Sequence, residues 1–267
     1  MKVRSLGYRT DLIFPAFDGV IIDRGNYLVI RTPSNPTFYW GNFLLFDHPP
    51  QEGDYSRWQE IFAKEIGIPP QVEHQAFGWD TTNNETGIIQ PFLESGFILE
   101  HLAVLTVPRD HLTPKSSPGV ILRPLLSEND WNQSIENQVI CREPMFPEAG
   151  YRIFRQRQVK RNRAMVSHGL GAWFGAFSGS RLVADLGIFC DRELGRYQSV
   201  QTHPDFRRRG IAGALVYNAA LYALDHFNLE TLVIVAEADS PAERLYQSIG
   251  FQITEYQLGI WKSDEAA

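Results

Sequence analysis

The residues best suited to chemistry form one short segment, HPDFRRRGIAGAL, which runs from His203 to Leu215. It places three consecutive arginines beside Gly210, Ala212 and Gly213. Arginines supply directional positive charge, and small residues let an anion approach the main chain closely. An apolar run with helical spacing follows, so the segment should open a helix, whose first N–H groups and dipole favour negative charge. These features together predict a phosphate-binding loop.

The affinity of this loop for phosphate has to come from several contacts at once. A helix dipole alone contributes about 0.3 to 1 kcal/mol, whereas each charge-assisted hydrogen bond contributes about 1.5 to 3 kcal/mol. The sequence has no G-x-x-x-x-G-K-[ST], and no G-x-G-x-x-G opens a first strand-helix unit, which excludes the common nucleotide-binding loops. For a lone R-x-x-G, a solvated helix start would be the better interpretation. The choice between that and a phosphate-binding loop therefore depends on the surrounding elements.

Those elements predict a mixed sheet. Residues 172–177, 182–190 and 196–202 read as three strands whose short connections make them antiparallel. The helix predicted at 213–227 is apolar almost all round, and the strand predicted at 231–236 is uninterruptedly apolar. This crossover makes the strands at 196–202 and 231–236 parallel. Helices predicted at 128–142, 148–166 and 241–248 and a strand at 251–261 complete this half.

A second motif lies some 30 residues after the loop: A-x-x-L-Y-x-x-x-G-F, from Ala242 to Phe251. Together with R-x-x-G-x-A, from Arg207 to Ala212, and in this order and spacing, it resembles the GNAT N-acetyltransferase superfamily. The resemblance covers roughly residues 120–262. It implies an α/β (α+β) fold with a mixed central sheet flanked by helices, as in acyl-CoA N-acyltransferases.

The resemblance also implies roles for particular residues. Acetyl-CoA would be the co-substrate, with no metal, and Val200 and Thr202 would pair through their backbone with its pantetheine arm. Tyr246 would lie near the thioester sulfur as the catalytic acid. Asp239 departs from the pattern, since many members have Asn there, which puts a side-chain contact to CoA in doubt. The main chain of the loop would hold the pyrophosphate through Arg207, Arg208, Arg209, Gly210, Ile211, Ala212 and Gly213.

Acid–base chemistry sets what the site must do. A lysine-like amine with a pKa of about 10.4 costs about 4 to 5 kcal/mol to deprotonate at pH 7 before it attacks the thioester. The leaving thiol resembles Cys, with a pKa of about 8.5, whereas Tyr is near 10, so Tyr246 is expected to stabilise the thiolate by hydrogen bonding. The alternative for Tyr246 is a packing role. Asp185, Glu237 and His168 stay open as the base.

The composition of the chain limits the classes of molecule that the protein is expected to bind. The net charge of −6 and the pI near 5.7 argue against a general affinity for nucleic acid or anionic membranes. The two cysteines, Cys141 and Cys190, form no metal or disulfide motif, and the N-terminus lacks a signal-peptide core, so we expect a cytoplasmic protein. The predicted partner is a small-molecule or peptide amine acceptor, whose identity stays open, as does the oligomeric state.

The run from Tyr151 to Arg163 carries six basic residues and no acidic one. In the superfamily the matching helix borders the acceptor site, which makes an anionic acceptor one interpretation. A solvated helix face is the other. Two further functions also stay open: a tandem transferase that uses a longer acyl or aminoacyl donor, and a non-catalytic acyl-CoA-binding module.

The Pro/Ser-rich stretch at 108–119 predicts a linker, with domains at 1–113 and 114–267. In the first domain FLESGF, at 92–97, parallels YQSIGF, at 246–251, with Phe92 in the place of Tyr246. A degenerate tandem copy of the same fold explains this echo, and an unrelated α+β domain is the alternative. Strands are predicted at 19–31, 76–79 and 97–107, a core strand with its entry turn at 38–46, and helices at 55–66 and 87–94.

Overall fold

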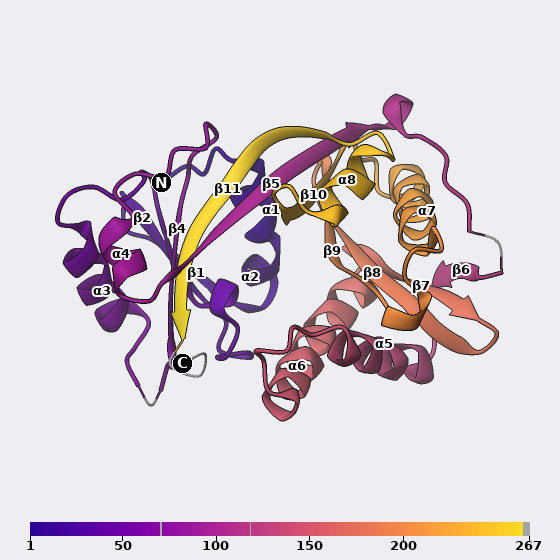
Figure 1. The fold of residues 1–267 in the computed structure, drawn as a ribbon, viewed down its shortest axis with the longest axis horizontal. Helices are drawn as coiled ribbons and strands as arrows, with labels where there is room; N and C mark the ends of the chain where they lie inside the picture. The colour runs from indigo at the N-terminus through magenta and orange to yellow at the C-terminus, as the bar shows by residue number, and fades with distance from the viewer. Residues whose placement is uncertain (70, 118, 264–267) are drawn as a thin grey trace. The chain divides into compact units, whose positions relative to one another are not determined.

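A computed structural model of the chain describes residues 1–69, 71–117 and 119–263 (Figure 1). The chain forms two compact units. Unit 1 holds Met1–Val104, Ala236–Ala238 and the residues from Thr254 onward, and unit 2 holds Leu105–Val235 and Asp239–Ile253. Each compact unit is made of several segments of the sequence, whereas the predicted domains are two successive segments. The predicted boundary between residues 113 and 114 therefore stays a prediction.

Unit 1 is built on a mixed sheet. Strands β1 (Val20–Asp23), β2 (Tyr27–Arg31) and β3 (Phe43–Phe46) form an antiparallel meander. Strands β3 and β4 (His74–Trp79) are parallel across the crossover helix α3 (Asp54–Glu65), and β11 (Gln252–Ser263) pairs antiparallel with β4. The elements are α1 (Leu6–Asp11), α2 (Ile13–Asp18), β1 (Val20–Asp23), β2 (Tyr27–Arg31), η1 (Tyr39–Gly41), β3 (Phe43–Phe46), α3 (Asp54–Glu65), β4 (His74–Trp79), α4 (Gln90–Glu94) and β5 (Ile98–Pro108).

One prediction for this unit is wrong in detail. The single strand expected at 19–31 is a hairpin, because Gly25 adopts a φ of 92° and its N–H donates to Asp23 Oδ1 at 2.8 Å. At 38–46 the expected entry turn is the 3-10 turn at Tyr39–Gly41, and the expected core strand is the buried strand at Phe43–Phe46. Helices α1 and α2 were not predicted.

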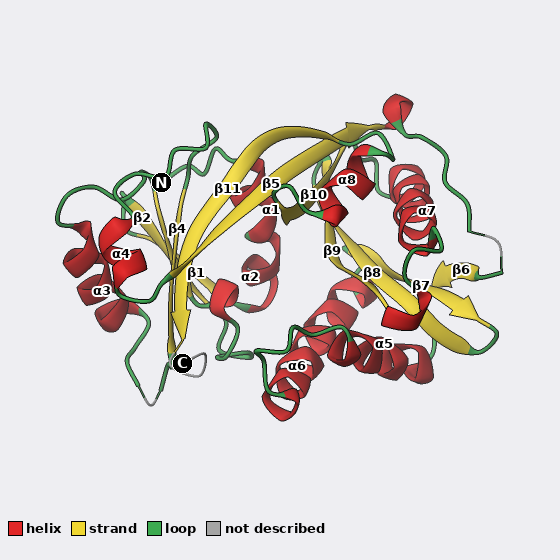
Figure 2. Cartoon of the chain, viewed as in Figure 1, coloured by secondary structure: helices red, strands yellow, loops and turns green. Residues whose placement is uncertain are grey.

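Unit 2 contains the predicted arrangement. Strands β7, β8 and β9 are antiparallel neighbours, and β9 is parallel to β10, which confirms the mixed sheet. Helices α5 and α6 cover one face of this sheet and α7 covers the other (Figure 2). The elements are η2 (Arg109–His111), β6 (Ile121–Pro124), α5 (Glu128–Ile140), α6 (Glu148–Ser167), β7 (Gly171–Ser178), β8 (Arg181–Asp191), β9 (Leu194–Thr202), η3 (Pro204–Phe206), α7 (Ile211–His226), β10 (Thr231–Glu237), α8 (Pro241–Gln247) and β11 (Gln252–Ser263).

Both units follow one order of elements: an antiparallel meander, a helix, a parallel strand, a short helix and a last strand. The turns after the short helices correspond hydrogen bond by hydrogen bond. Phe97 N donates to Phe92 O at 3.1 Å, and Phe251 N donates to Tyr246 O at 3.2 Å. Gly96 and Gly250 hold the left-handed position in the two turns, with φ of 87° and 110°. The echo between the two hexapeptides is therefore a structural equivalence.

The last strand completes unit 1 from the far end of the sequence. Residues Leu258–Ser263 of β11 pair antiparallel with His74–Trp79 of β4. In the strand order, β5 is the neighbour of β10. Short-range patterns in the sequence predict that these strands exist but do not predict their partners.

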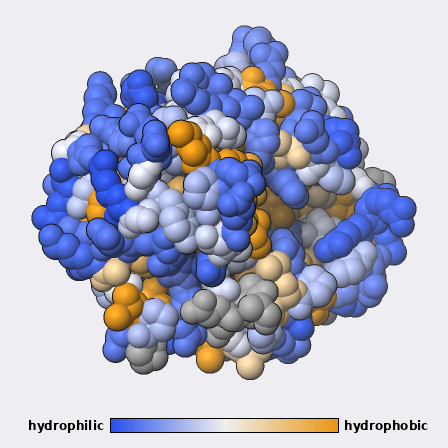
Figure 3. Space-filling view, turned by 60° about the vertical axis from the view of Figure 1, so that its left-hand side comes forward, coloured by the Kyte–Doolittle hydropathy of each residue, from blue (hydrophilic) through white to orange (hydrophobic). Residues whose placement is uncertain are grey.

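The surface of the protein is largely hydrophilic on the face shown in Figure 3, where apolar side chains gather in a few patches. Exposed single apolar residues are normal for globular proteins. Within the part of the chain that the structure describes, no helix is long and apolar enough to cross a membrane.

Candidate active site

The arginine-rich loop lies in unit 2, where β9 passes through η3 into α7. Two of its residues adopt the left-handed conformation: Arg208, with a φ of 60°, and Gly210, the N-cap of α7, with a φ of 76°. Among the described residues, no group accepts a hydrogen bond from the N–H groups of Arg208, Arg209 or Gly210. The first N–H groups of α7 also lack partners within the helix. These amides form a concave nest that can bind an anion.

Interactions within unit 2 hold the loop in this shape. Arg207 Nε donates to the carbonyl of Thr202 at 3.1 Å, and Arg209 Nη2 donates to the carbonyl of Asp205 at 2.7 Å. Ser117 Oγ, from the predicted linker, donates to the carbonyl of Arg209 at 3.0 Å. Two of the three guanidinium groups thus brace the loop, which leaves Arg208 as the side chain best placed to meet a phosphate.

We expect Arg208→Ala to weaken CoA binding about tenfold, because it removes one charge-assisted hydrogen bond and leaves the amides in place. The measurement is calorimetric titration with CoA at two salt concentrations. Arg192→Ala is the matched control, since Arg192 also has a positive φ, of 53°, in a turn of the same unit. Equal affinities for the two variants would contradict a role for the Arg208 side chain.

Strand β9 separates from its parallel neighbour as it approaches the loop. Its pairing with β10 covers only Leu194 to Arg196, opposite Thr231 to Val233. The remainder of β9, around Val200, therefore has a backbone edge to which an extended ligand could add as a strand. The carbonyl of Thr202 in this stretch already accepts from Arg207 Nε at 3.1 Å and from Cys141 Sγ at 3.3 Å. On the other side the register with β8 shifts between Asp185 and Gly187, where Ser199 has a φ of 50°.

Tyr246 lies on α8, and only 5% of its surface is exposed. Burial raises the pKa of its phenol, so the group is a hydrogen-bond donor at every ordinary assay pH. Among the described residues, no group forms a hydrogen bond with its hydroxyl. The hydroxyl is therefore available to a ligand.

The candidate base Asp185 is fully buried and has four hydrogen-bond donors. Burial raises the pKa of its carboxyl, and the donors lower it. Its oxygens accept from Ser134 at 2.6 Å, Asn137 at 2.6 Å, Gln138 at 2.9 Å and Trp173 at 3.0 Å. A carboxylate satisfied in this way joins α5 to the sheet, and it has no access to a substrate amine.

We expect Asp185→Asn to keep turnover and to lower the free energy of unfolding by about 1 to 3 kcal/mol, because an amide NH2 would face buried donors. Urea unfolding and steady-state turnover at pH 7 measure the two effects. A variant that is fully stable but inactive would return Asp185 to the list of possible bases.

The equivalent place in unit 1 has different residues at the start of its helix. Gly53, the N-cap of α3, has a φ of 85° and corresponds to Gly210. The next residue, however, is Asp54, which is 2% exposed and accepts from Gln51 N at 2.9 Å. A protein carboxylate therefore occupies the helix N-terminus, and the first turn of α7 has no acidic residue.

The strand gap is also closed in unit 1. Strand β3 pairs with β4 as far as Phe46, opposite Trp79, and Asp80 N donates to Phe46 O at 2.8 Å. Trp58 stacks on Phe46 with ring centroids 3.9 Å apart. Phe92, which is fully buried, replaces the phenol of Tyr246. The loop with unpartnered amides, the separation of the two parallel strands and the buried hydroxyl thus occur together in unit 2, and their counterparts among the described residues of unit 1 differ.

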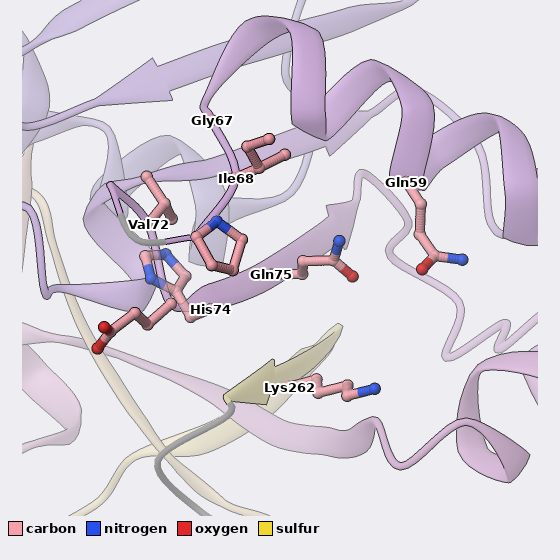
Figure 4. Close-up of a pocket in the computed structure, with 9 residues that line it drawn as sticks. Gln59, Gly67, Ile68, Val72, His74, Gln75 and Lys262 are labelled. Carbon is pink, nitrogen blue, oxygen red and sulfur yellow. The ribbon is translucent and has the colours of Figure 1, made fainter.

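A cavity of about 150 Å³ lies in unit 1 beside the C-terminal end of α3, and Figure 4 shows its lining residues. Its walls include Gln59, His74, Gln75 and Lys262. Burial lowers the pKa of His74 to about 4, and its Nε2 lies 3.0 Å from the carbonyl of Asn42, so the ring is a neutral donor. The cavity is smaller than most ligand sites, and it is remote in sequence from every predicted site residue.

The sequence did not single out three residues around the site. Ser199 has the positive φ in β9, Arg155 of α6 donates to Ser199 Oγ at 3.3 Å, and Cys141 Sγ donates to the carbonyl of Thr202 at 3.3 Å. A basic run was visible around Arg155, but the sequence could not show which of its side chains reaches the strand. No group of three or more His, Cys, Asp or Glu side chains among the described residues could hold a metal ion.

Comparisons with known proteins agree with this geometry. Residues 174–259 match the family model described as FR47-like protein. A functionally unknown conserved protein from Staphylococcus epidermidis ATCC 12228 has a similar structure, with a TM-score of 0.72 at 16% identity over 92% of this chain and 95% of that one. The search of curated proteins gives no match.

Two further solved structures carry family names. A GCN5-related N-acetyltransferase from Kribbella flavida has a TM-score of 0.65 at 13% identity, over 97% of this chain and 96% of that one. A tandem GNAT protein from the clavulanic acid biosynthesis pathway has a TM-score of 0.55 at 11% identity, over 84% and 75%. At these identities the likeness concerns the fold.

The chain thus has the fold of GNAT acyltransferases, in two tandem copies. The predicted resemblance is confirmed, and the segment matched by the family model contains both the arginine-rich loop and Tyr246.

Proposed function

We propose that the protein is an N-acetyltransferase that moves an acetyl group from acetyl-CoA to a primary amine. The observation that carries the proposal is the combination, within unit 2, of the amide nest at Arg208–Gly210, the free edge of β9 and the buried phenol of Tyr246. The nest would hold the diphosphate, and the edge around Val200 and Thr202 would pair with the pantetheine arm. This would direct the thioester toward Tyr246.

The reaction needs no covalent enzyme intermediate. The neutral amine attacks the thioester carbonyl, the carbon–sulfur bond breaks, and the thiolate leaves with the electron pair. The phenol of Tyr246 would donate a hydrogen bond to the departing sulfur. The attacking nitrogen, which is positively charged in the tetrahedral adduct, would lose its extra proton to water as the neutral amide forms. Because burial keeps the phenol protonated, it can serve as donor throughout the working pH range.

The test is thiol release from acetyl-CoA with a panel of primary amines, together with calorimetry for CoA. Amine-dependent thiol release with acetylated product supports the proposal. Binding of CoA without turnover for any amine would favour a non-catalytic acyl-CoA-binding module. Faster turnover with longer acyl-CoA or with an aminoacyl donor would favour the tandem transferase with a different donor.

A further inference from the structure

We propose that the amine acceptor carries a carboxylate, which Arg155 binds. This inference rests on the proposed function and adds the chemical class of the acceptor to it. The residue lies on α6, one of the two helices that cover the face of the unit 2 sheet opposite α7 (Figure 2).

Arg155 is surrounded by neutral partners. Its guanidinium donates to Tyr151 Oη at 2.6 and 2.9 Å, to Gln158 Oε1 at 2.6 Å and to Ser199 Oγ at 3.3 Å. No described carboxylate forms an ion pair with it. A half-buried charge without a counter-ion is costly, and a ligand anion would offset that cost.

Other arginines of the same helix differ in this respect. Arg152 pairs with Glu136 and Glu148, and Arg163 pairs with Glu128. The expectation that the basic run is simply a solvated helix face therefore holds for these two, whose charges already have protein partners. It does not explain why Arg155 turns toward β9.

The position of Arg155 fits the acceptor of the proposed reaction. Ser199, which it contacts, lies in the part of β9 that has left β10, three positions before Thr202. A strand rises about 3.3 Å per residue, so Ser199 is about 10 Å from Thr202 along the path proposed for the pantetheine arm. Burial raises the pKa of the Cys141 thiol, and Arg207 and, to a smaller extent, Arg155 oppose this shift; the same thiol donates to the Thr202 carbonyl.

The guanidinium is also held in a fixed orientation. It lies 5.0 Å from the ring centre of Tyr151 and 5.1 Å from that of Phe154, in addition to its hydrogen bonds. Its contacts use Nε, both N–H groups of Nη1 and one of Nη2, which leaves one N–H of Nη2 to donate to a carboxylate oxygen. One guanidinium balances one negative charge, so a carboxylate suits it better than a doubly charged phosphate group.

The experiment compares α-amino acids with their own amides as acceptors, using acetyl-CoA and the full-length protein. Each pair presents the same amine, and rates are corrected for the fraction of free amine. We expect kcat/KM to be roughly 10- to 100-fold higher for the amino acids, and Arg155→Gln to remove this difference through KM. Arg155→Lys should restore part of it. A phosphate-bearing amine is included as a third arm.

Arg157→Gln is the matched control, because Arg157 is exposed on the same helix. It should keep the preference, and calorimetry should show unchanged CoA affinity for all three variants. Three outcomes would overturn the inference and leave the proposed acetyl transfer intact. They are equal kcat/KM for acids and amides, a stronger preference for the phosphate-bearing amine, and an equal loss of kcat/KM on acids and amides in Arg155→Gln. Absence of turnover with every amine would overturn the proposed function and this inference together.

Discussion

Gly210→Glu should weaken CoA binding by roughly 100-fold or more, which corresponds to about 2.7 kcal/mol or more. The new carboxylate would stand at the N-terminus of α7, in the nest that we assign to the diphosphate, and two negative charges would then compete for the same amides. Gly210 also has a φ of 76°, so any side chain adds strain there. Calorimetric titration with CoA measures the loss.

The matched control is Gly53→Glu. Gly53 is the left-handed N-cap of α3, and an added Cβ would meet no atom within 4 Å, while at Gly210 the nearest atom is Ser116 O at 3.5 Å. Both variants therefore carry similar backbone strain, and only Gly210→Glu should lose CoA affinity. If Gly210→Glu binds CoA like the unsubstituted protein, the amides of this loop do not hold a diphosphate.

Tyr246→Phe should lower turnover by roughly 10- to 10,000-fold and leave CoA affinity unchanged, because it removes only the donor to the leaving sulfur. The buried ring keeps its contact with Phe251, at a centroid distance of 6.3 Å. Since burial raises the pKa of the phenol, turnover of the unsubstituted protein should rise with pH as the amine loses its proton. No falling limb from Tyr246 is expected below about pH 10.

Tyr197→Phe is the companion variant for this measurement. Tyr197 is 2% exposed, and its hydroxyl donates to the carbonyl of Val216 at 2.8 Å. Its loss should cost about 0.5 to 1.5 kcal/mol of stability and leave turnover near its normal value. If both substitutions reduce turnover equally, the effect belongs to the packing of this region, and Tyr246 has no separate chemical role.

The sequence predicts unit 2 well because its signals are local. Short connections between three strand-like runs predict the meander, the arginine-glycine segment marks the start of α7, and the apolar run at 231–236 predicts a buried strand. Unit 1 was harder to predict because its turns are made by single residues. The hairpin around Gly25 depends on its positive φ and on one hydrogen bond that its N–H donates to Asp23 Oδ1. The apolar runs on both sides conceal this turn in the sequence.

Only the site residues that belong to a sequence motif could be predicted. The loop from Arg207 to Gly213 and Tyr246 belong to recognisable patterns, and their roles stay predictions until ligand binding is measured. The contact between Arg155 and Ser199 joins residues 44 positions apart in sequence, so no local pattern reports it. The bulge at Ser199 likewise depends on a register shift between β8 and β9.

The pairing of β11 with β4 has a consequence for biosynthesis. Strand β4 ends at Trp79, and its partner residues are Leu258–Ser263, far along the sequence. During translation all the residues between these two strands must be synthesised before β4 acquires this neighbour. A nascent chain that has only its first hundred residues outside the exit tunnel would present an uncapped strand edge, a hazard for aggregation that chaperones would have to cover.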